Sequence, residues 1–307
     1  MIKEGVIIIN KPADWTSQDV CAKLRGRLHI KRIGHTGTLD PMATGVLPVC
    51  IGNATRIIEY YDMDKKRYHA AMQLGIVTDT LDITGQVIEE KDWINVVDED
   101  VFTAFNDYKG DILQIPPKYS AVKINGRRAY ELAREGKEID IKPRNIKIFD
   151  NKITSIDLKS GIIEFDVECS KGTYIRSMID DIGNKLGCGA TMTSLVRTGS
   201  GIFDIDNAVD LASIVEMSDE EINNLIIPAD ITISNLGSVI INDNNIIAAR
   251  HGNRISQQSY SIINESTFET EGKFCYRMYS SDNMFIGVGI IIDNYLQPKK
   301  VIVDADI

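Results

Sequence analysis

The sequence has few of the residues that would indicate a secreted, metal-binding or membrane protein. Its five cysteines are odd in number and scattered, and its four histidines share no ligand spacing with them, which argues against a disulfide framework and a zinc site. No apolar run approaches the roughly 20 residues of a membrane-spanning helix, and the start, MIKEGVIIINKP, lacks a signal-peptide cleavage pattern. We therefore expect a cytoplasmic protein with reduced, buried cysteines, no metal and no membrane contact.

Positively charged residues are also fewer than negatively charged ones. The chain contains 34 Lys and Arg against 44 Asp and Glu, which gives a net charge of -10. A uniformly acidic surface would repel nucleic acid. Salt screens exposed charges beyond about 8 Å, however, so the local distribution of charge matters more than the total. Residues 23–32 carry only positive charges, and residues 118–147 carry more positive than negative ones. These two stretches are either solvated faces or surfaces for a polyanion.

The hydrophobic pattern predicts an α+β protein built around a mixed or antiparallel sheet, without regular βαβ alternation. Six segments carry strand patterns and six carry helical spacing. The strands are expected at 5–10, 45–52, 68–76, 112–115, 144–158 and 161–169, and the helices at 17–29, 54–61, 98–108, 127–136, 177–187 and 208–217. A break near residues 227–236 separates residues 1–230 from a tail, 236–307, of short strands spaced by glycine.

The segment HTGTLDPMATGVLPV, from His35 to Val49, contains a single carboxylate, that of Asp40. Glycines allow close approach of backbone or ligand, and Pro41 restricts Asp40 to an extended conformation, so the acid has a defined direction. The residues alone leave two interpretations open. Asp40 either performs carboxylate chemistry or caps its own backbone in an Asx turn.

This loop resembles that of the TruB family of bacterial tRNA pseudouridine synthases, which isomerise uridine 55 in the T arm. Further matches follow in order along the whole chain: Asn10-Lys11-Pro12, Lys66-Arg67-Tyr68, PPKYSAVKINGRRAYELAREG from Pro116, and CSKGTYIRSMIDDIG from Cys169. The resemblance implies a pseudouridine synthase fold in residues 1–230, with a thumb-like RNA-binding insertion at 116–143, and a PUA-like small β-barrel in residues 236–307. It also implies tRNA as the substrate, no cofactor, and a monomer that needs no protein partner.

By this resemblance Asp40 is the catalytic carboxylate, Arg176 pairs with it, and Tyr68 stacks on the flipped uracil and helps move the C5 proton. An isolated carboxylate in an apolar pocket would become neutral, so a cation such as Arg176 is needed to keep it charged. Asp180 and Asp181 are alternative partners for Arg176, and core packing is the alternative role for Tyr68. Whether Asp40 attacks C1′ or C6 of the nucleotide, or acts as a base, stays open.

The remaining expected site residues would bind the substrate. Lys11 would form the pocket floor, Leu195 would pack against the base, Tyr174 would pack beside Arg176, and His35 would fill the space left by the flipped nucleotide. Five basic side chains of the thumb would contact phosphates: Lys118, Lys123, Arg127, Arg128 and Arg134.

Three other functions compete with this one. The guide-RNA-dependent archaeal and eukaryotic synthases share the loop but lack this thumb helix. An RNA-binding or RNA-folding protein could use the same fold without catalysis. A glycosidase-like hydrolase would need paired carboxylates, which the loop around Asp40 does not contain.

Overall fold

The structure, a computed structural model, describes residues 2–61, 65–124, 126–137 and 139–302. Strands up to residue 210 are β1 (Gly5–Lys11), β2 (Ile33–His35), β3 (Thr44–Ile51), β4 (Lys65–Leu74), β5 (Ile76–Thr78), β6 (Val87–Glu90), β7 (Gly110–Gln114), β8 (Lys123–Ile124), β9 (Arg127–Arg128), β10 (Arg144–Asp157), β11 (Ile162–Ser170), β12 (Ala190–Ser200), β13 (Phe203–Asp204) and β14 (Val209–Asp210). The α-helices of this part are α1 (Ser17–Leu28), α2 (Asp98–Asp107), α3 (Ala129–Arg134), α4 (Ile175–Lys185), α5 (Leu211–Glu216) and α6 (Asp219–Leu225).

The C-terminal part contains a second set of short elements. They are β15 (Gly237–Ile241), α7 (Ile246–Arg250), β16 (Ile255–Ser256), β17 (Tyr260–Asn264), β18 (Glu269–Thr270), β19 (Lys273–Tyr279), β20 (Phe285–Ile292) and β21 (Tyr295–Val301).

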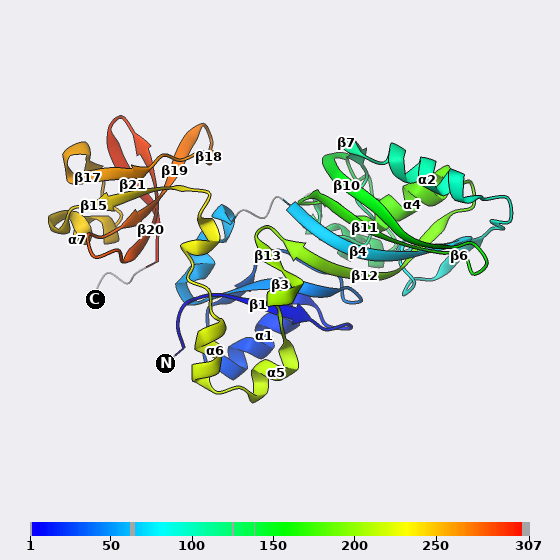
Figure 1. Cartoon of the computed structure of the whole chain (residues 1–307), viewed down its shortest axis with the longest axis horizontal. Coiled ribbons are helices and arrows are strands. Elements are labelled where there is room, and N and C mark those ends of the chain that lie inside the picture. The colour runs from blue at the N-terminus through cyan, green and yellow to red at the C-terminus, as the bar shows by residue number, and fades with distance from the viewer. Residues whose placement is uncertain (1, 62–64, 125, 138, 303–307) are drawn as a thin grey trace.

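Each part is built on its own sheet, and the two stand side by side in Figure 1. The larger sheet runs β14-β1-β3-β12-β4-β11-β10-β7, with β2 on β3 and β13 on β12. The smaller sheet runs β16-β21-β20-β19-β15-β17, with β18 on β19. The larger sheet contains parallel and antiparallel neighbours, which confirms the predicted α+β class with a mixed central sheet.

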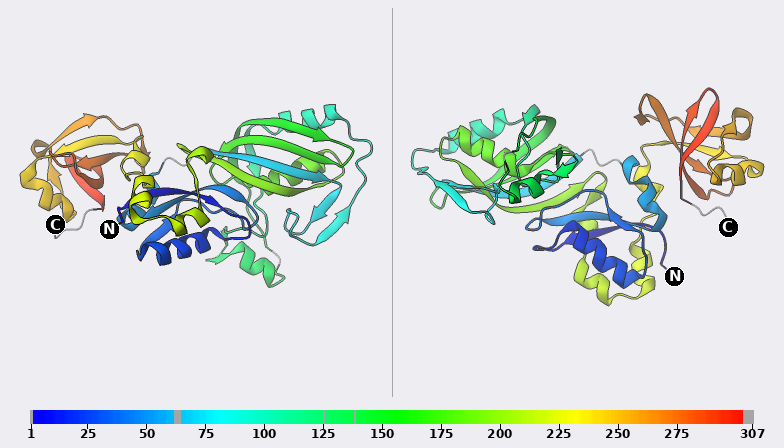
Figure 2. Two further views of the ribbon diagram at one scale, coloured as in Figure 1. Left: turned by 60° about the horizontal axis from the view of Figure 1, so that its bottom comes forward. Right: turned by 180° about the vertical axis from the view of Figure 1, so that it is seen from behind.

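The larger sheet consists of two halves with separate cores. Helices α1, α5 and α6 cover β1 and β3 through one cluster of buried apolar side chains, whereas α2 and α4 cover β4, β10, β11 and β12 through another. Figure 2 shows these helices on the two halves. Strands β3 and β12 join the halves by parallel pairing at two positions, Thr44 with Val196 and Gly45 with Arg197. We call this pairing of β3 with β12 the seam, and the loop that carries Asp40 ends at it.

The C-terminal unit is fixed to the first by a shared apolar cluster. Ile57 and neighbouring side chains of the larger unit pack against Ile233, Val288 and Ile290. Lys300 forms an ion pair of 2.8 Å with Glu59, and Arg56 donates a hydrogen bond of 2.7 Å to the Val301 carbonyl. The small β unit is therefore held against the half of the larger sheet that contains β1 and β3.

Two expected elements differ from the structure. Residues 54–61, expected as an α-helix, lie in a 3₁₀ helix, Gly52–Tyr60. The buried residues Ala54, Ile57 and Tyr60 recur every third position, which suits a helix with three residues per turn. Residues 208–217, expected as one helix, divide into β14 and α5, because Val209 pairs with Ile9 at the sheet edge.

The sequence pattern missed β12 altogether. Its first half, Ala-Thr-Met-Thr-Ser, has only two apolar residues, and the strand contains register shifts against β4 at Met192/Ser194 and Arg197/Gly199. Long-range pairing on both sides, with β4 and β3, determines the strand. This is a case in which tertiary context overrides local preference.

The seam depends on glycine at position 45. Gly45 has φ +100°, and a Cβ there would lie 2.3 Å from the Arg197 carbonyl oxygen. We expect Gly45→Ala to lower the free energy of unfolding by more than the roughly 1–2 kcal/mol of left-handed backbone strain alone. Gly187→Ala is the matched control, because Gly187 has φ +80° with nothing within 4 Å of its Cβ position. Urea unfolding of both variants measures the difference, and equal losses would contradict close contact at the seam.

Candidate active site

Asp40 lies on a loop between β2 and β3 that is held on both sides of the carboxylate. The Ser17 hydroxyl accepts a hydrogen bond from the Leu39 amide (2.9 Å) and donates to the Leu39 carbonyl (3.3 Å). On the other side, the Asp14 amide donates to the Pro41 carbonyl (2.9 Å). The loop also closes on itself, since the Ala43 amide donates to the Asp40 carbonyl (3.1 Å). The direction of the Asp40 side chain is therefore set by its neighbours.

Lys11, at the end of β1, binds the backbone of the loop. Its side chain is fully buried, and its ammonium group donates to the carbonyls of Pro12 (2.8 Å), Trp15 (2.6 Å) and Pro41 (3.0 Å). Burial lowers the pKa of Lys11 to about 8, against the attraction of nearby carboxylates. Lys11 thus ties the end of β1 to the residue that follows Asp40.

The expected ion pair between Arg176 and Asp40 is present. Arg176 is the second residue of α4, and it is nearly fully buried. Its Nη2 lies 2.9 Å from Asp40 Oδ2, and the Asp40 side chain is 34% exposed. The guanidinium also donates to the carbonyls of Thr80 (2.8 Å) and Tyr119 (3.0 Å). The alternative partner Asp181 instead accepts a hydrogen bond from Tyr108 (2.8 Å). Arg176 therefore fixes an accessible carboxylate from a buried position.

A second carboxylate, which the sequence did not indicate, contacts the same guanidinium. Asp82 Oδ2 lies 3.5 Å from Arg176 Nη1, and the Asp82 side chain is buried. Its other oxygen accepts from the Thr80 hydroxyl (3.0 Å), the Thr84 hydroxyl (2.5 Å) and the Thr84 amide (3.1 Å). Arg176 is thus held between a buried acid and an exposed one. The sequence signal that could have indicated Asp82 is the hydroxyl-rich segment TDTLDITG, residues 78–85.

Tyr68 and Leu195 come together beside the loop. They lie on adjacent strands, β4 and β12, and belong to the same buried cluster as Leu39 and Ala43. Burial raises the pKa of Tyr68 to about 12, although Arg197 opposes the shift. Tyr68 is therefore a neutral phenol at neutral pH.

His35 is the last residue of β2 and lies at the start of the loop. Burial, and then the nearby Arg197, lower its pKa, so the imidazole is neutral at neutral pH. Within the described part of the chain its buried Nδ1 has no hydrogen-bond partner.

Tyr174 connects this site to the insertion expected as a thumb. It precedes α4, and its ring packs against Val122, Ala129 and Ile141. Gln114 fixes its backbone by two hydrogen bonds, of 2.8 and 3.0 Å. Residues 125 and 138 of the insertion lie outside the described residues. The helix predicted at 127–136 is the shorter α3.

The five basic side chains of the insertion that are expected to contact phosphates are all exposed: Lys118, Lys123, Arg127, Arg128 and Arg134. Arg127 forms an exposed ion pair with Glu135, which Lys137 also contacts (2.7 Å). Arg128 and Arg134 lie by the ring of Tyr130, with 5.9 and 5.5 Å from guanidinium carbon to ring centroid. This face combines two cations with an aromatic ring.

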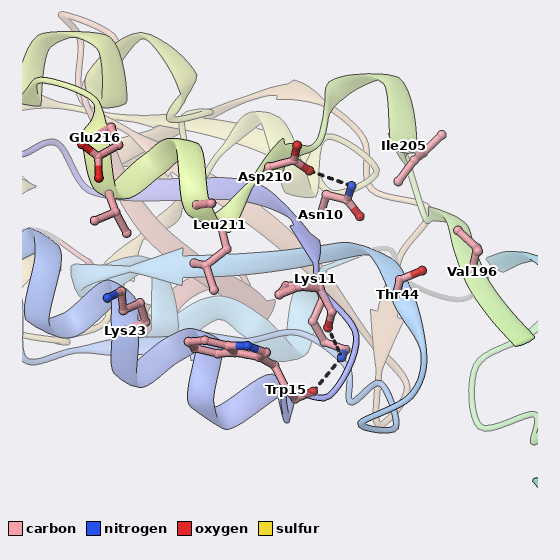
Figure 3. Close-up of a pocket in the computed structure, with 13 residues that line it drawn as sticks. Asn10, Lys11, Trp15, Lys23, Thr44, Val196, Ile205, Asp210, Leu211 and Glu216 are labelled. Atoms are coloured by element: carbon pink, nitrogen blue, oxygen red, sulfur yellow. Dashed lines mark hydrogen bonds between the residues drawn. The ribbon is translucent and has the colours of Figure 1, made fainter. Parts of the chain in front are cut away.

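A cavity of about 820 Å³ lies beside the site, where the end of β1 meets α1 and α5 (Figure 3). Of the expected site residues only Lys11 lines it, together with Trp15, Leu211 and Val215. The Asp210 carboxylate accepts a hydrogen bond of 2.9 Å from Asn10 at its rim. Asp40, Tyr68 and Arg176 do not line this cavity, so it is separate from the carboxylate site.

The described residues contain no group of three or more His, Cys, Asp or Glu side chains placed to hold a metal ion. None of their helices is both long and apolar enough to cross a membrane.

The chain matches three family models in succession: the N-terminal domain of TruB family pseudouridylate synthase at residues 25–175, the tRNA pseudouridylate synthase B C-terminal domain at 176–234, and the C-terminal domain of pseudouridine synthase II TruB at 237–302. Curated relatives include tRNA pseudouridine synthase B of Clostridium tetani, with 42% identity over 93% of this chain and 94% of that protein, and of Microcystis aeruginosa, with 41% over 97% and 99%. The chain therefore belongs to the TruB family.

Solved structures agree on the fold. A chain of the archaeal box H/ACA sRNP Nop10-Cbf5 complex has a TM-score of 0.74 and 25% identity, covering 99% of this chain and 88% of that one. A chain of a Cbf5-Nop10-Gar1 complex has a TM-score of 0.74 and 26% identity, covering 98% and 86%. Both units of the present chain are included in these matches, which confirms the pseudouridine synthase fold.

The loop geometry predicts the effect of removing the Lys11 ammonium. We expect Lys11→Met to raise the hydrogen-exchange rates of the Asp14 and Leu39 amides by on the order of 10-fold to 100-fold, because hydrogen bonds to charged groups contribute about 1.5–3 kcal/mol each. Lys66→Met is the control, since Lys66 is also a buried lysine but binds the Ser200 hydroxyl (2.7 Å). Unchanged exchange in Lys11→Met would mean that the other contacts hold the loop alone.

Proposed function

We propose that this protein isomerises uridine to pseudouridine in tRNA, at position 55 of the T arm. The named activity of relatives with about 40% identity over nearly the whole chain supports this substrate. The observation that carries the proposal is the partly exposed carboxylate of Asp40, held by the buried guanidinium of Arg176. A carboxylate that is fixed and accessible is what a reaction at the sugar of a nucleotide requires.

The reaction breaks the bond between N1 of uracil and C1′ of ribose, turns the base, and joins C5 to C1′ with loss of the C5 proton. It leaves the oxidation state unchanged, so acid–base and nucleophilic groups can perform it. We assign the carboxylate role to Asp40, as nucleophile or base at the nucleotide. Arg176 keeps this carboxylate anionic and aimed, because a planar guanidinium grips a carboxylate in a fixed direction.

Tyr68 and Leu195 are proposed to hold the flipped uracil during its turn. Stacking of a base on an aromatic ring contributes about 1–3 kcal/mol, comparable to the few kcal/mol needed to extrude the base from its stack. The Tyr68 hydroxyl lies in the same buried cluster as Leu39 of the Asp40 loop, so it is a candidate for handling the C5 proton. His35, neutral and with an unpartnered Nδ1 among the described residues, is suited to occupy the space that the nucleotide leaves.

Phosphate contacts are proposed for the thumb, residues 116–143, within a catalytic unit of residues 1–230. Tyr119 and Tyr174 connect this insertion to Arg176 and α4, so RNA bound there would lie next to the site. Lys118, Lys123, Arg128 and Arg134 are free to meet phosphates, whereas Arg127 would first have to leave Glu135. Such contacts position RNA, and specificity comes from loop shape and the flipped base.

The residues 236–307 are proposed to form a PUA-like unit that adds to RNA contact; residues 303–307 lie outside the described part. We further propose that the protein acts in the cytoplasm as a monomer, without guide RNA or protein partner. The thumb helix α3 and the bacterial relatives favour this over guide-dependent action. The archaeal chains of similar fold are described in complexes with Nop10 and Gar1, at lower identity.

The central test is incubation of the pure protein with an unmodified tRNA transcript and with a T-arm hairpin, followed by mapping of pseudouridine. We expect Asp40→Asn to slow single-turnover conversion by on the order of 10² to 10⁴-fold, the range typical of a positioned catalytic group. Its dissociation constant for the hairpin should change little, because the amide keeps the side-chain shape.

Asp14→Asn is the matched control, since Asp14 is an exposed acid of the same charge next to the same loop. It should retain the wild-type rate. Equal rates for Asp40→Asn and wild type would remove Asp40 from the reaction, and wild-type protein that leaves every uridine unchanged would refute the function itself.

A further inference from the structure

Arg197 is the largest fully buried side chain of the described residues, with 1% of its surface exposed. It stands on β12 opposite Tyr68 of β4 and opposite Gly45 of β3. One residue therefore touches the strand that carries Tyr68 and the strand that continues from the Asp40 loop. It lies at the seam between the two halves of the sheet.

The guanidinium of Arg197 has only neutral partners within the described residues. Its Nε donates to the Val46 carbonyl (2.6 Å), and its Nη2 donates to the Gly37 carbonyl (3.3 Å). It also faces Tyr68 across the pair of strands β4 and β12, and it lowers the pKa of that phenol against the effect of burial. No ion pair with a carboxylate is found for it there. Burying a cation in this way is costly, and a methionine could fill similar volume without that cost. Core packing alone therefore does not account for the charge.

The position of Arg197 opposite Tyr68 sets the direction of a hydrogen bond between the two side chains. A guanidinium has five donors and no acceptor. In such a bond the phenol oxygen accepts, and its own O–H hydrogen points away from Arg197. At the same time, the bond to Gly37 ties Tyr68 to the loop that presents Asp40 three residues later.

We propose that Arg197 is a positioning residue for this site, which orients the Tyr68 hydroxyl and holds the Tyr68 strand and the Asp40 loop in one geometry. The kinetic test of this inference rests on the proposed function. Arg197 would be a further residue of the site, in addition to Asp40, Tyr68 and Arg176. Arg197 acts through Tyr68 and Gly37 and does not itself contact the reacting atoms. Loss of the guanidinium therefore affects the chemical step more than RNA affinity.

The test compares Arg197→Met, which keeps volume, and Arg197→Lys, which keeps charge, with Lys66→Met as a control for loss of another buried cation from the same sheet. We expect Arg197→Met to lower the single-turnover rate with a T-arm hairpin by on the order of 10-fold to 100-fold, the effect of losing hydrogen bonds to a charged group. The dissociation constant should stay within about threefold, and Arg197→Lys should recover part of the rate, because an ammonium can still donate one of the bonds.

A second measurement needs no activity. Tyrosine labelled with ¹³C at Cζ reports the hydrogen bond at the phenol oxygen, and Tyr68→Phe identifies the Tyr68 signal. Arg197→Met should shift this signal while Lys66→Met leaves it in place. In the Tyr68→Phe background, the further loss of rate from Arg197→Met should be smaller than in wild type, because part of the pathway through the hydroxyl is already gone.

Each outcome either supports or overturns the positioning role of Arg197. A Tyr68 signal that is unchanged in Arg197→Met, or a rate loss no greater than that of Lys66→Met, overturns the positioning role. A weakened affinity with an unchanged rate also overturns it. If wild-type protein makes no pseudouridine, the proposed function fails, while the NMR comparison still decides whether Arg197 orients Tyr68.

Discussion

The seam between β3 and β12 is the constraint on which the site depends. Two half-sheets with separate cores meet there through parallel pairing at Thr44–Val196 and Gly45–Arg197. The Asp40 loop enters the seam from one half, and Tyr68 and Leu195 approach it from the other. A displacement of one half against the other would move the Asp40 carboxylate relative to Tyr68 and Leu195, so the packing of the sheet determines the geometry of the site.

Buried cations hold the site in place on three sides. Lys11 binds the loop backbone after Asp40, Arg197 binds it before Asp40, and Arg176 binds the Asp40 carboxylate itself. Arg176 in turn is anchored by Asp82 and by carbonyls of the neighbouring loop and the thumb. Each of these charges is costly to bury and is satisfied by several acceptors, which favours one arrangement over alternatives.

The sequence predicted the parts of this arrangement that have local signals. Asp40 stood out as the one acid of a glycine-rich loop, and the position of Arg176 near a helix start, together with the family resemblance, led to its pairing with Asp40. Asp82, Arg197 and β12 were not recognised as parts of the arrangement, because their roles come from contacts between segments far apart in the chain. The ion pair of Arg127 with Glu135 was not foreseen for a similar reason, since the two side chains meet only when the insertion folds back on itself. In the segment Gly52–Tyr60, burial at every third residue accompanies a 3₁₀ helix, whereas the sequence spacing predicts an α-helix.

The central claim is that Arg176, anchored by Asp82, aims the Asp40 carboxylate for chemistry. It is tested most directly by the single-turnover rate of pseudouridine formation in Asp82→Asn, beside Asp79→Asn, which alters an acid of the same turn that binds the Gln86 amide (2.8 Å). The account predicts a rate lowered by on the order of 10-fold or more in Asp82→Asn, with hairpin affinity retained and Asp79→Asn close to wild type. Equal rates in the two variants would contradict it.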